Sequence, residues 1–594
     1  MGLWLFRKGK FAESIPYFRC AIETLVMRNP NPYDGEPYYN LGLALKFLGE
    51  NREAYESFYK ACWNAAWQGA GFYSLAQLSI IDGRWQDAEE EVEKALIRNG
   101  HNHRARHLKA AILRHKGEIK QALKWIEESL EIDRFNFGCL FEQYLISGVE
   151  TLRATSLQSM RNLMGRDSHN YEEIALDYIQ SGLYDEAVLL LQLCMDEANP
   201  SPMTYYYQAY SYHLSGKVKE AKQAFESAAK QSPDYCFPNR LEAILALQTA
   251  CSENPGDAYA PYYLGNLWYD KQQYSDAIAC WERSASINPN YPVTLRNLAL
   301  AAFNKQKDVK KTIALLEKAY HLNEKDVRIL MELDQLRKRL NYPPTERLSF
   351  LEARMDSVQQ RDDLYLEFVT LLNQSGRYEE AKAMIDQRKF HPWEGGEGKA
   401  TGQYVLCRLE LAKKAIAKKK YKEAIVLLNE TDVYPENLGE GKLFNAEENE
   451  IHYYKGIAYK GLRETEQARE CFFKATIGSS EPVQAFFYND QQPDKIFYQG
   501  LAWRELNEEG KASNCFHKLI AHGEKHLFDE CKIDYFAVSL PDLAIWDDDL
   551  NTRNKIHCYY VMALGFSGLR EDKMAEFFYE KVKELDINKY VFRK

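Results

Sequence analysis

The stretch EPYYNLGLALKFLGENREAYESFYKA (36–61) opens a pattern that recurs every 34 residues, without a gap, as far as residue 134. A glycine marks each period and an alanine follows it by five positions: Gly49 and Ala54, Gly83 and Ala88, Gly117 and Ala122. Before the first glycine, Tyr38, Leu41 and Leu45 are spaced as one apolar face of a helix. A glycine between two helical stretches can end the first of them in the left-handed conformation. Each period is therefore predicted to be two short amphipathic helices joined by a tight turn.

A period of 34 residues with this pattern of small residues is typical of the tetratricopeptide repeat. One such hairpin cannot bury its apolar face alone, so neighbouring hairpins must stack on it. We therefore predict an all-α fold: a tetratricopeptide-type α-solenoid, a right-handed superhelix of helix–turn–helix repeats, with long Gly- and Pro-rich loops in its C-terminal part. The first helix of each repeat is expected to line a concave face, and such a face normally recognises a protein or peptide.

The pattern changes around NYPPTERLS (341–349), which predicts a domain boundary there. Residues 1–345 are predicted to form an N-terminal solenoid that is irregular at 135–170 and at 236–258, where 239–257 is expected to be one extra helix. Residues 346–594 are predicted to form a C-terminal helical-repeat region with three unusual loops, at 391–399, 434–442 and 534–551. The sequence begins within a repeat, so we expect its N-terminal end to continue a longer structure or to pack on another domain.

Composition excludes several classes of function. The 594 residues carry a formal charge of −10, and 76 basic and 86 acidic side chains are interspersed along them. Without a basic patch or arm, nucleic acid is not an expected partner. No apolar run approaches the ~20 residues that span a bilayer, and the start has no secretory signal, so we expect no membrane partner and a cytoplasmic location. The twelve cysteines are scattered singly, as buried reduced thiols of a cytosolic protein would be.

One column of ring-bearing residues is the most general recognition signal. The fifth position of each predicted first helix should face the groove, and it holds Tyr39, Tyr73, His107, Tyr206, Tyr262, Tyr453 and Phe497. Such rings can stack on sugars or clasp an extended peptide, although tyrosine is also a common filler of these helices. The basic clamp that some of these modules use for a C-terminal carboxylate is not predicted, because of its positions only Arg104 is basic.

Two loops resemble each other. HPWEGGEGK (391–399) and YPENLGEGK (434–442) both follow P-x-x-x-G-E-G-K, 43 residues apart. Backbone amides beside Glu and Lys could hold a polar ligand, and the alternative is that both loops are structured helix ends. They do not form a phosphate-binding Walker loop, because Ala400 and Leu443 replace its Ser or Thr. The candidate binding residues here are Trp393, Glu394, Glu397, Lys399, Glu436, Asn437, Glu440 and Lys442.

A third loop, DYFAVSLPDLAIWDDDLN (534–551), places Asp547, Asp548 and Asp549 beside Trp546. These carboxylates could serve acid–base chemistry or a cation site, and the alternative is a solvated turn or a helix N-cap. His103 and His107 lie one helical turn apart, but no cysteine or carboxylate near them in the sequence completes a metal site. We find no local motif of a serine hydrolase, zinc protease or kinase, and so predict no catalytic residue, no metal and no cofactor.

Together, residues 34–68, FHPWEGGEGK, YPENLGEGK and the DYFAVSLPDL and DDDLN segments resemble a family of large bacterial tetratricopeptide proteins that carry an N-terminal β-sandwich domain of unknown function. The resemblance implies that this chain corresponds to the helical C-terminal half, and that a β-sandwich domain packs on its N-terminal end. That sandwich is similar to mutarotase-like folds that handle sugars, which suggests a carbohydrate ligand by analogy only.

Three hypotheses follow. The first is a non-catalytic scaffold that binds a protein or peptide on an open, continuous concave face. The alternative is a carbohydrate-binding or carbohydrate-processing protein, in which Glu397, Glu440 and Asp548 would meet on one rim. The third is that the loops only brace the sandwich domain. An enzymatic activity is the less expected outcome.

Overall fold

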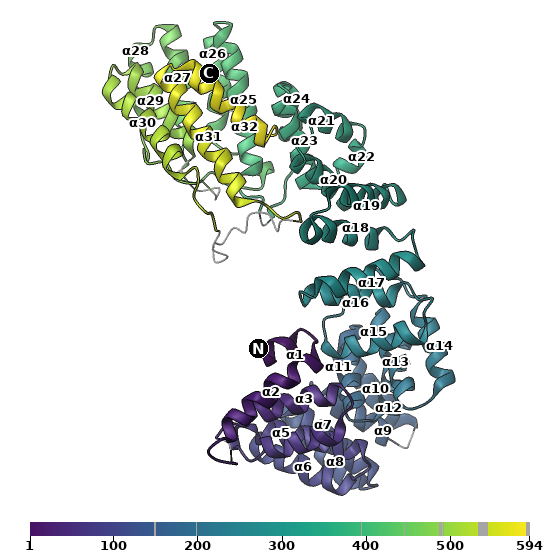
Figure 1. The fold of residues 1–594 in the computed structure, drawn as a ribbon. Helices are drawn as coiled ribbons and strands as arrows, with labels where there is room; N and C mark the ends of the chain where they lie inside the picture. Colours follow the sequence, from purple (N-terminus) through teal and green to yellow (C-terminus); the bar gives the residue numbers. More distant parts are fainter. Residues whose placement is uncertain are drawn as a thin grey trace. The chain divides into compact units, whose positions relative to one another are not determined.

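The computed structural model describes residues 1–594 except 32, 148–149, 198, 394, 445, 486–489, 491, 533–544 and 590–594, and it does not describe the side chains of 150–154 and 197. The described residues form helices and connecting turns, with no β-strand among them. The prediction of an all-α, tetratricopeptide-type solenoid is confirmed. The chain divides into two compact units, unit 1 (1–301) and unit 2 (302–594), coloured from purple to teal and from teal to yellow in Figure 1.

Unit 1 is a succession of helical hairpins in which each helix packs on the next (Figure 1). Its helices are α1 (Gly2–Arg7), α2 (Phe11–Val26), α3 (Glu36–Phe47), α4 (Asn51–Ala61), α5 (Gln68–Ile81), α6 (Trp85–Arg98), α7 (His103–His115), α8 (Ile119–Ile132), α9 (Phe137–Ile146), α10 (Glu150–Met164), α11 (Ser168–Gln180), α12 (Tyr184–Glu197), α13 (Pro202–Leu214), α14 (Val218–Ala228), α15 (Leu241–Glu253), α16 (Tyr259–Asp270), α17 (Tyr274–Ile287) and α18 (Pro292–Ala301), with a short 3-10 helix at Ala65–Trp67. The extra helix predicted at 239–257 is α15.

The hairpin of α3 and α4 shows why the repeat needs its small residues. Gly49 has a φ of +79°, so it supplies the left-handed turn between the two helices. Phe58 is fully buried on α4, and a Cβ added to Gly42 would lie 2.7 Å from its ring. A larger residue at position 42 would therefore push the two helices apart.

The two ends of unit 1 meet. Lys10 Nζ lies 2.9 Å from Asp276 Oδ2 of α17, and a Cβ added to Gly9 would lie 2.6 Å from Ile244 of α15. Farther inside, Gln77 of α5 donates a hydrogen bond to Ser181 at the end of α11. The hairpins of unit 1 therefore curve until the first of them packs on the last.

Unit 2 begins with a π-helical turn, Ala302–Gln306, labelled η2. Its helices are α19 (Val309–Leu322), α20 (Val327–Arg339), α21 (Pro344–Glu352), α22 (Met355–Val358), α23 (Asp362–Gln374), α24 (Tyr378–Gln387), α25 (Lys399–Ala417), α26 (Tyr421–Asn429), α27 (Asn449–Leu462), α28 (Thr465–Lys474), α29 (Pro493–Glu505), α30 (Glu509–His526), α31 (Leu550–Leu569) and α32 (Asp572–Leu585), with 3-10 turns η3 (Glu430–Asp432) and η4 (Glu436–Leu438).

The ends of unit 2 are joined by buried polar groups. Arg347 of α21 is fully buried and bonds Asp334 of α20 at 2.5 Å and Glu367 of α23 at 2.7 Å. Its third partner is the side-chain oxygen of Asn588, which follows α32, at 2.9 Å. Asn341 also donates to the carbonyl of Leu585. One guanidinium therefore holds the C-terminal end of the unit against its first helices.

These contacts bear on the predicted boundary at residue 345. That position falls within α21, inside unit 2, whereas the units divide between 301 and 302. Because Arg347 ties α20, α21 and α23 together, residues 302–345 pack with the C-terminal half of the chain. The segment 135–170, predicted as irregular, contains α9 and α10.

Candidate functional site

A cavity of about 950 Å³ lies on the inner side of unit 2. Helices α20, α23 and the first turns of α25 line it, together with residues 545–549, the start of α31 and residues 585–589. It brings together two of the predicted loops, because Trp393 and Lys399 lie on one wall and Asp547, Asp548 and Asp549 on another. The sequence predicted these loops as sites, and it gave no sign that α20 and α23 would complete the walls.

Trp546 anchors the aspartate-rich loop to the start of the unit. Its side chain is 1% exposed, and its Nε1 donates to the carbonyl of Glu332 in α20 at 3.0 Å. Its ring meets Phe303 edge-on at 5.2 Å. Asn304 bonds the backbone on both sides of the tryptophan. The tryptophan therefore fixes residues 545–547 against the first helices of unit 2, on one wall of the cavity.

Each of the three aspartates already has a partner within unit 2. Asp547 pairs with Lys307 at 3.3 Å, and Asp548 pairs with Arg339 at 2.9 Å. Asp549 is the N-cap of α31 and accepts a 2.6 Å hydrogen bond from the Thr552 hydroxyl, which lowers the pKa of the aspartate. The N-cap alternative therefore holds for Asp549. The remaining acidic positions of this loop, 534 and 542, lie outside the described residues.

The second Gly-Glu-Gly-Lys loop (434–442) lies between α26 and α27 and contacts the end of α24 and the start of α25. Asn437 donates to the carbonyls of Ile385 and Arg388, each at 2.9 Å, where α24 ends. Glu440 accepts a 2.9 Å hydrogen bond from the backbone N–H of Gly398, where α25 begins. Its pKa is raised, mainly by burial. These two side chains complete helix ends that would otherwise lack partners.

The other residues of the two loops differ in what they contact. Lys442 donates to two backbone carbonyls of η3 and pairs with Glu448 at 2.6 Å. Glu436 is exposed, and Glu397 is partly exposed and lies near enough to Glu440 to raise the pKa of that carboxyl. Glu394 lies outside the described residues. The Trp393 ring covers Gly396, where an added Cβ would lie 2.2 Å from the ring, so the tryptophan has a fixed place on the cavity wall.

The predicted ring column only partly faces the inner side. His107, Tyr206, Tyr262 and Phe497 are at most 5% exposed, so they belong to the core and do not form a ligand-contacting surface. The cause is packing within each unit. The His107 ring lies 4.6 Å from the Tyr178 ring of α11, and the Tyr206 hydroxyl donates to Asp257 at 2.7 Å. Tyr39, Tyr73 and Tyr453 are partly exposed.

On the inner side of unit 1, Tyr73 belongs to a polar network that the sequence did not reveal. Lys46 of α3 donates to Gln77 Oε1 at 2.7 Å, and Gln77 donates to the Tyr73 hydroxyl at 3.2 Å. Arg104 of α7 lies 3.4 Å from Asp177 of α11. Burial lowers the pKa of Lys46 to about 7 and raises the pKa of Asp177 to about 6. The sequence marked only Tyr73 and Arg104, because the partners that the network finds at α11, Asp177 and Ser181, are far from them along the chain.

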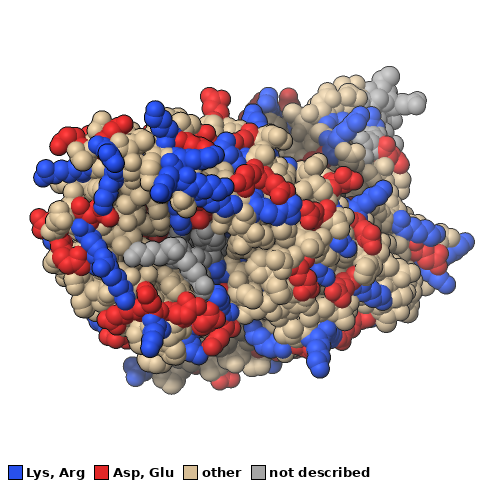
Figure 2. Space-filling model, turned by 90° about the horizontal axis from the view of Figure 1, so that it is seen from above, with Lys and Arg blue, Asp and Glu red and all other residues tan. Residues whose placement is uncertain are grey.

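The described residues contain neither a group of side chains that could hold a metal ion nor a helix that could span a membrane. They contain no group of three or more His, Cys, Asp or Glu side chains arranged to hold a metal ion. None of their helices is long and apolar enough to cross a bilayer. On the face drawn in Figure 2, acidic and basic side chains are interspersed. The sulfurs of all twelve cysteines are free thiols.

Comparison with known families identifies the repeat. Three segments match models of the tetratricopeptide repeat: 35–62, 75–137 and 203–235. This chain carries tetratricopeptide repeats. All three segments lie in unit 1, and they include α3 and α4, where the 34-residue period was first seen.

Solved structures that are similar to parts of this chain, at low sequence identity, include three repeat proteins. A tetratricopeptide repeat protein from Parabacteroides merdae is 17% identical over 39% of this chain and 91% of its own, with a TM-score of 0.28. MamA from Desulfovibrio magneticus is 17% identical over 34% of this chain and 99% of its own, with a TM-score of 0.20. YrrB, described as having an unusual peptide-binding site, is 14% identical over 40% of this chain and 95% of its own, with a TM-score of 0.16.

Proposed function

We propose that this protein is a non-catalytic tetratricopeptide scaffold that binds a protein or peptide segment on the inner face of unit 1. One observation carries the proposal. The segments that match the tetratricopeptide repeat lie in unit 1, and the inner face of the same unit has partly exposed aromatic and charged side chains. Recognition is the usual function of stacked hairpins of this kind.

The inner face of unit 1 has the chemistry that an extended peptide needs. Tyr39 and Tyr73 offer partly exposed rings from α3 and α5. The Tyr39 ring is held 5.0 Å from the Trp67 ring, which limits the entropy that it would lose on binding. Arg104 is half exposed beside Asp177, so hydrogen-bonding groups lie next to the rings. Aromatic anchors among polar groups are typical of the centres of binding sites.

The loops of unit 2 support a structural role within this proposal. Asn437, Glu440 and Lys442 complete helix ends, and Asp547 and Asp548 pair with basic side chains of the same unit. We infer that these loops brace unit 2. A β-sandwich domain on the N-terminal end, a carbohydrate ligand and a cytoplasmic location rest on the sequence alone. A glycan array probed with the wild-type chain tests the carbohydrate alternative, and an absence of binding would remove it.

The scaffold proposal is tested by selecting peptides from a random display library on the whole chain. We then measure the affinity of the selected peptides for three variants. Tyr73→Ala and Tyr39→Ala should each weaken binding about tenfold, as aromatic anchors do. Tyr59→Ala is the matched control, because Tyr59 is 55% exposed on α4, away from the network of Tyr73. Peptides whose affinity is unchanged in both inner-face variants would contradict the proposal.

A further inference from the structure

Lys46 occupies an unusual place on the inner face of unit 1. It lies in the last turn of α3, and its amine donates a 2.7 Å hydrogen bond to the side-chain oxygen of Gln77. The residue is only partly exposed. Gln77 is itself held in place, because its amide donates to the Tyr73 hydroxyl at 3.2 Å and to Ser181 Oγ at 3.3 Å. The amine is therefore kept in one position by a fixed acceptor.

Among the carboxylates that the structure describes, none forms an ion pair with Lys46. Two other cations of unit 1 differ from Lys46 in this respect: Lys10 pairs with Asp276 at 2.9 Å, and Arg104 pairs with Asp177 at 3.4 Å. Placing an ammonium group in a recessed site without a counterion costs free energy, and an uncharged residue at this position would avoid that cost. The arrangement is explained if the counterion belongs to a ligand.

We propose that a carboxylate of the bound segment pairs with Lys46, so that the partner of unit 1 is an acidic peptide or an acidic segment of a protein. This inference rests on the proposed function and names the chemistry of its partner. The site differs from the basic clamp considered in the sequence, whose positions hold Tyr39, Leu43, Ser74 and Leu108. A carboxylate that reached Lys46 would lie beside Gln77, which donates to the Tyr73 hydroxyl.

Two carboxylates act on Lys46 without forming an ion pair with it. Burial lowers the pKa of the lysine to about 7, against the opposing effects of Glu242 on α15 and Asp177 on α11. Asp177 is already beside Arg104, and burial raises its own pKa to about 6. The inner face thus offers a fixed amine without an ion-pair partner, and one of the two carboxylates near it, Asp177, is already beside Arg104.

The same groups predict how the affinity for an acidic partner changes with pH. A carboxylate binds the protonated amine, and the fraction of Lys46 that is protonated falls as the pH rises through 7. Asp177 gains its negative charge as the pH rises through 6, which adds repulsion. The Glu242 carboxylate on α15 also acts on Lys46 and opposes an anionic ligand. The affinity for an acidic partner should therefore fall between pH 6 and pH 8.

The test uses two pools of labelled nonapeptides that differ at three fixed positions, Asp or Glu in one pool and Asn or Gln in the other. Binding to the whole chain is measured by fluorescence anisotropy. At pH 6.5 the acidic pool should bind about tenfold more tightly than the neutral pool, and this preference should shrink severalfold by pH 8.5. The variant K46M should abolish the preference. The variant K46R should retain it to higher pH, because a guanidinium stays charged.

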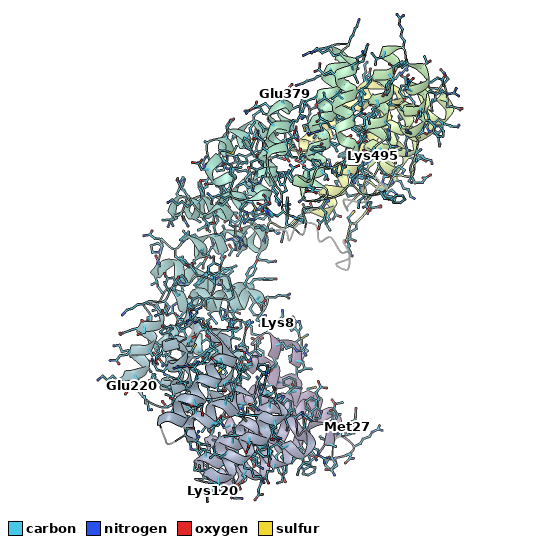
Figure 3. The ribbon with its side chains drawn as sticks, turned by 180° about the vertical axis from the view of Figure 1, so that it is seen from behind. Lys8, Met27, Lys120, Glu220, Glu379 and Lys495 are labelled. Atoms are coloured by element: carbon cyan, nitrogen blue, oxygen red, sulfur yellow. The ribbon has the colours of Figure 1, made fainter. Side chains whose placement is uncertain are left out.

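The variant K120M is the matched control. Lys120 is exposed at the outer edge of unit 1 (Figure 3), and its removal should leave the preference unchanged. A thermal melt of each variant shows whether it is folded, and K46R provides a second folded variant if K46M is not. If both pools bind equally well, or if folded K46M keeps the preference, the acidic partner is excluded while the scaffold stands. If neither pool binds, both proposals fail.

Discussion

Units 1 and 2 differ in the contacts that hold their two ends together. In unit 1 the hairpins follow the 34-residue period, and its ends meet through surface pairs such as Lys10 with Asp276 and through apolar contacts around Gly9. In unit 2 the connections are long, and the ends meet through the buried Arg347 and the inserted Trp546. The regular unit leaves polar groups on its inner face, whereas the irregular unit uses its inner face to hold itself together. This difference is the reason why we propose unit 1, and not unit 2, as the site of recognition.

The largest expected effect comes from removing Arg347. The variant Arg347→Ala leaves Asp334 fully buried without its partner, so unit 2 should lose about 4 kcal/mol of unfolding free energy. Unit 1 should be unaffected, so calorimetry should show one transition moving to lower temperature and one remaining. The control is Arg377→Ala, whose exposed pair with Glu380 should contribute less than about 1 kcal/mol. Equal shifts in both transitions would mean that the units are not separate.

Trp546→Ala should have the next largest effect, about 3 kcal/mol, because it leaves an unfilled space between α20 and Phe303. The destabilisation should be confined to unit 2. Urea unfolding followed by hydrogen exchange of α20 is a direct measurement. Trp63, which is 54% exposed in unit 1, provides the control substitution Trp63→Ala. A loss below about 1 kcal/mol would contradict the role assigned to Trp546.

Acid should affect unit 2 more than unit 1. Burial lowers the pKa of His452, His522 and His557 in unit 2 to about 4, and that of His107 in unit 1 to about 3. At a pH between the lowered pKa and the ordinary histidine pKa near 6.5, the histidine is protonated in the unfolded chain but not in the folded one. The unfolded chain therefore binds more protons, and the folded state loses stability as the pH falls through this range.

Unit 2 has three such histidines and unit 1 has one. At pH 5 unit 2 should therefore lose on the order of 2 kcal/mol more unfolding free energy than unit 1, after allowance for solvent screening. Far-ultraviolet circular dichroism from pH 7 to pH 4 should show unit 2 unfolding first. A simultaneous loss of both units would count against this difference.

The smallest of these effects concerns the loop 434–442, between α26 and α27. Asn437→Ala removes the donor to two backbone carbonyls and should cost about 2 kcal/mol, again in unit 2 alone. The neighbouring Glu436, which is exposed, supplies the control Glu436→Ala with an expected change near zero. If Asn437→Ala is also neutral, the loop is not a brace, and its polar residues become candidates for ligand binding again.

The comparison also shows how much the sequence could predict. The period at Gly49, Gly83 and Gly117 was sufficient for the hairpins, because each residue of that pattern acts on its immediate neighbours. It could not predict that α11 would cover His107, since that contact depends on how far successive hairpins rotate. The sequence also marked the aspartate-rich loop as unusual, but the contacts of this loop with α20 join residues more than two hundred positions apart, and no local pattern predicts them.

Hydrogen exchange of the whole chain, with and without a selected peptide at saturating concentration, tests the central claim most directly. The account predicts slower exchange in α3, α5, α7 and α11 of unit 1 on binding, with no change around Trp393 and residues 545–557 of unit 2. Protection confined to unit 2, with unit 1 unchanged, would contradict the assignment of recognition to the inner face of unit 1.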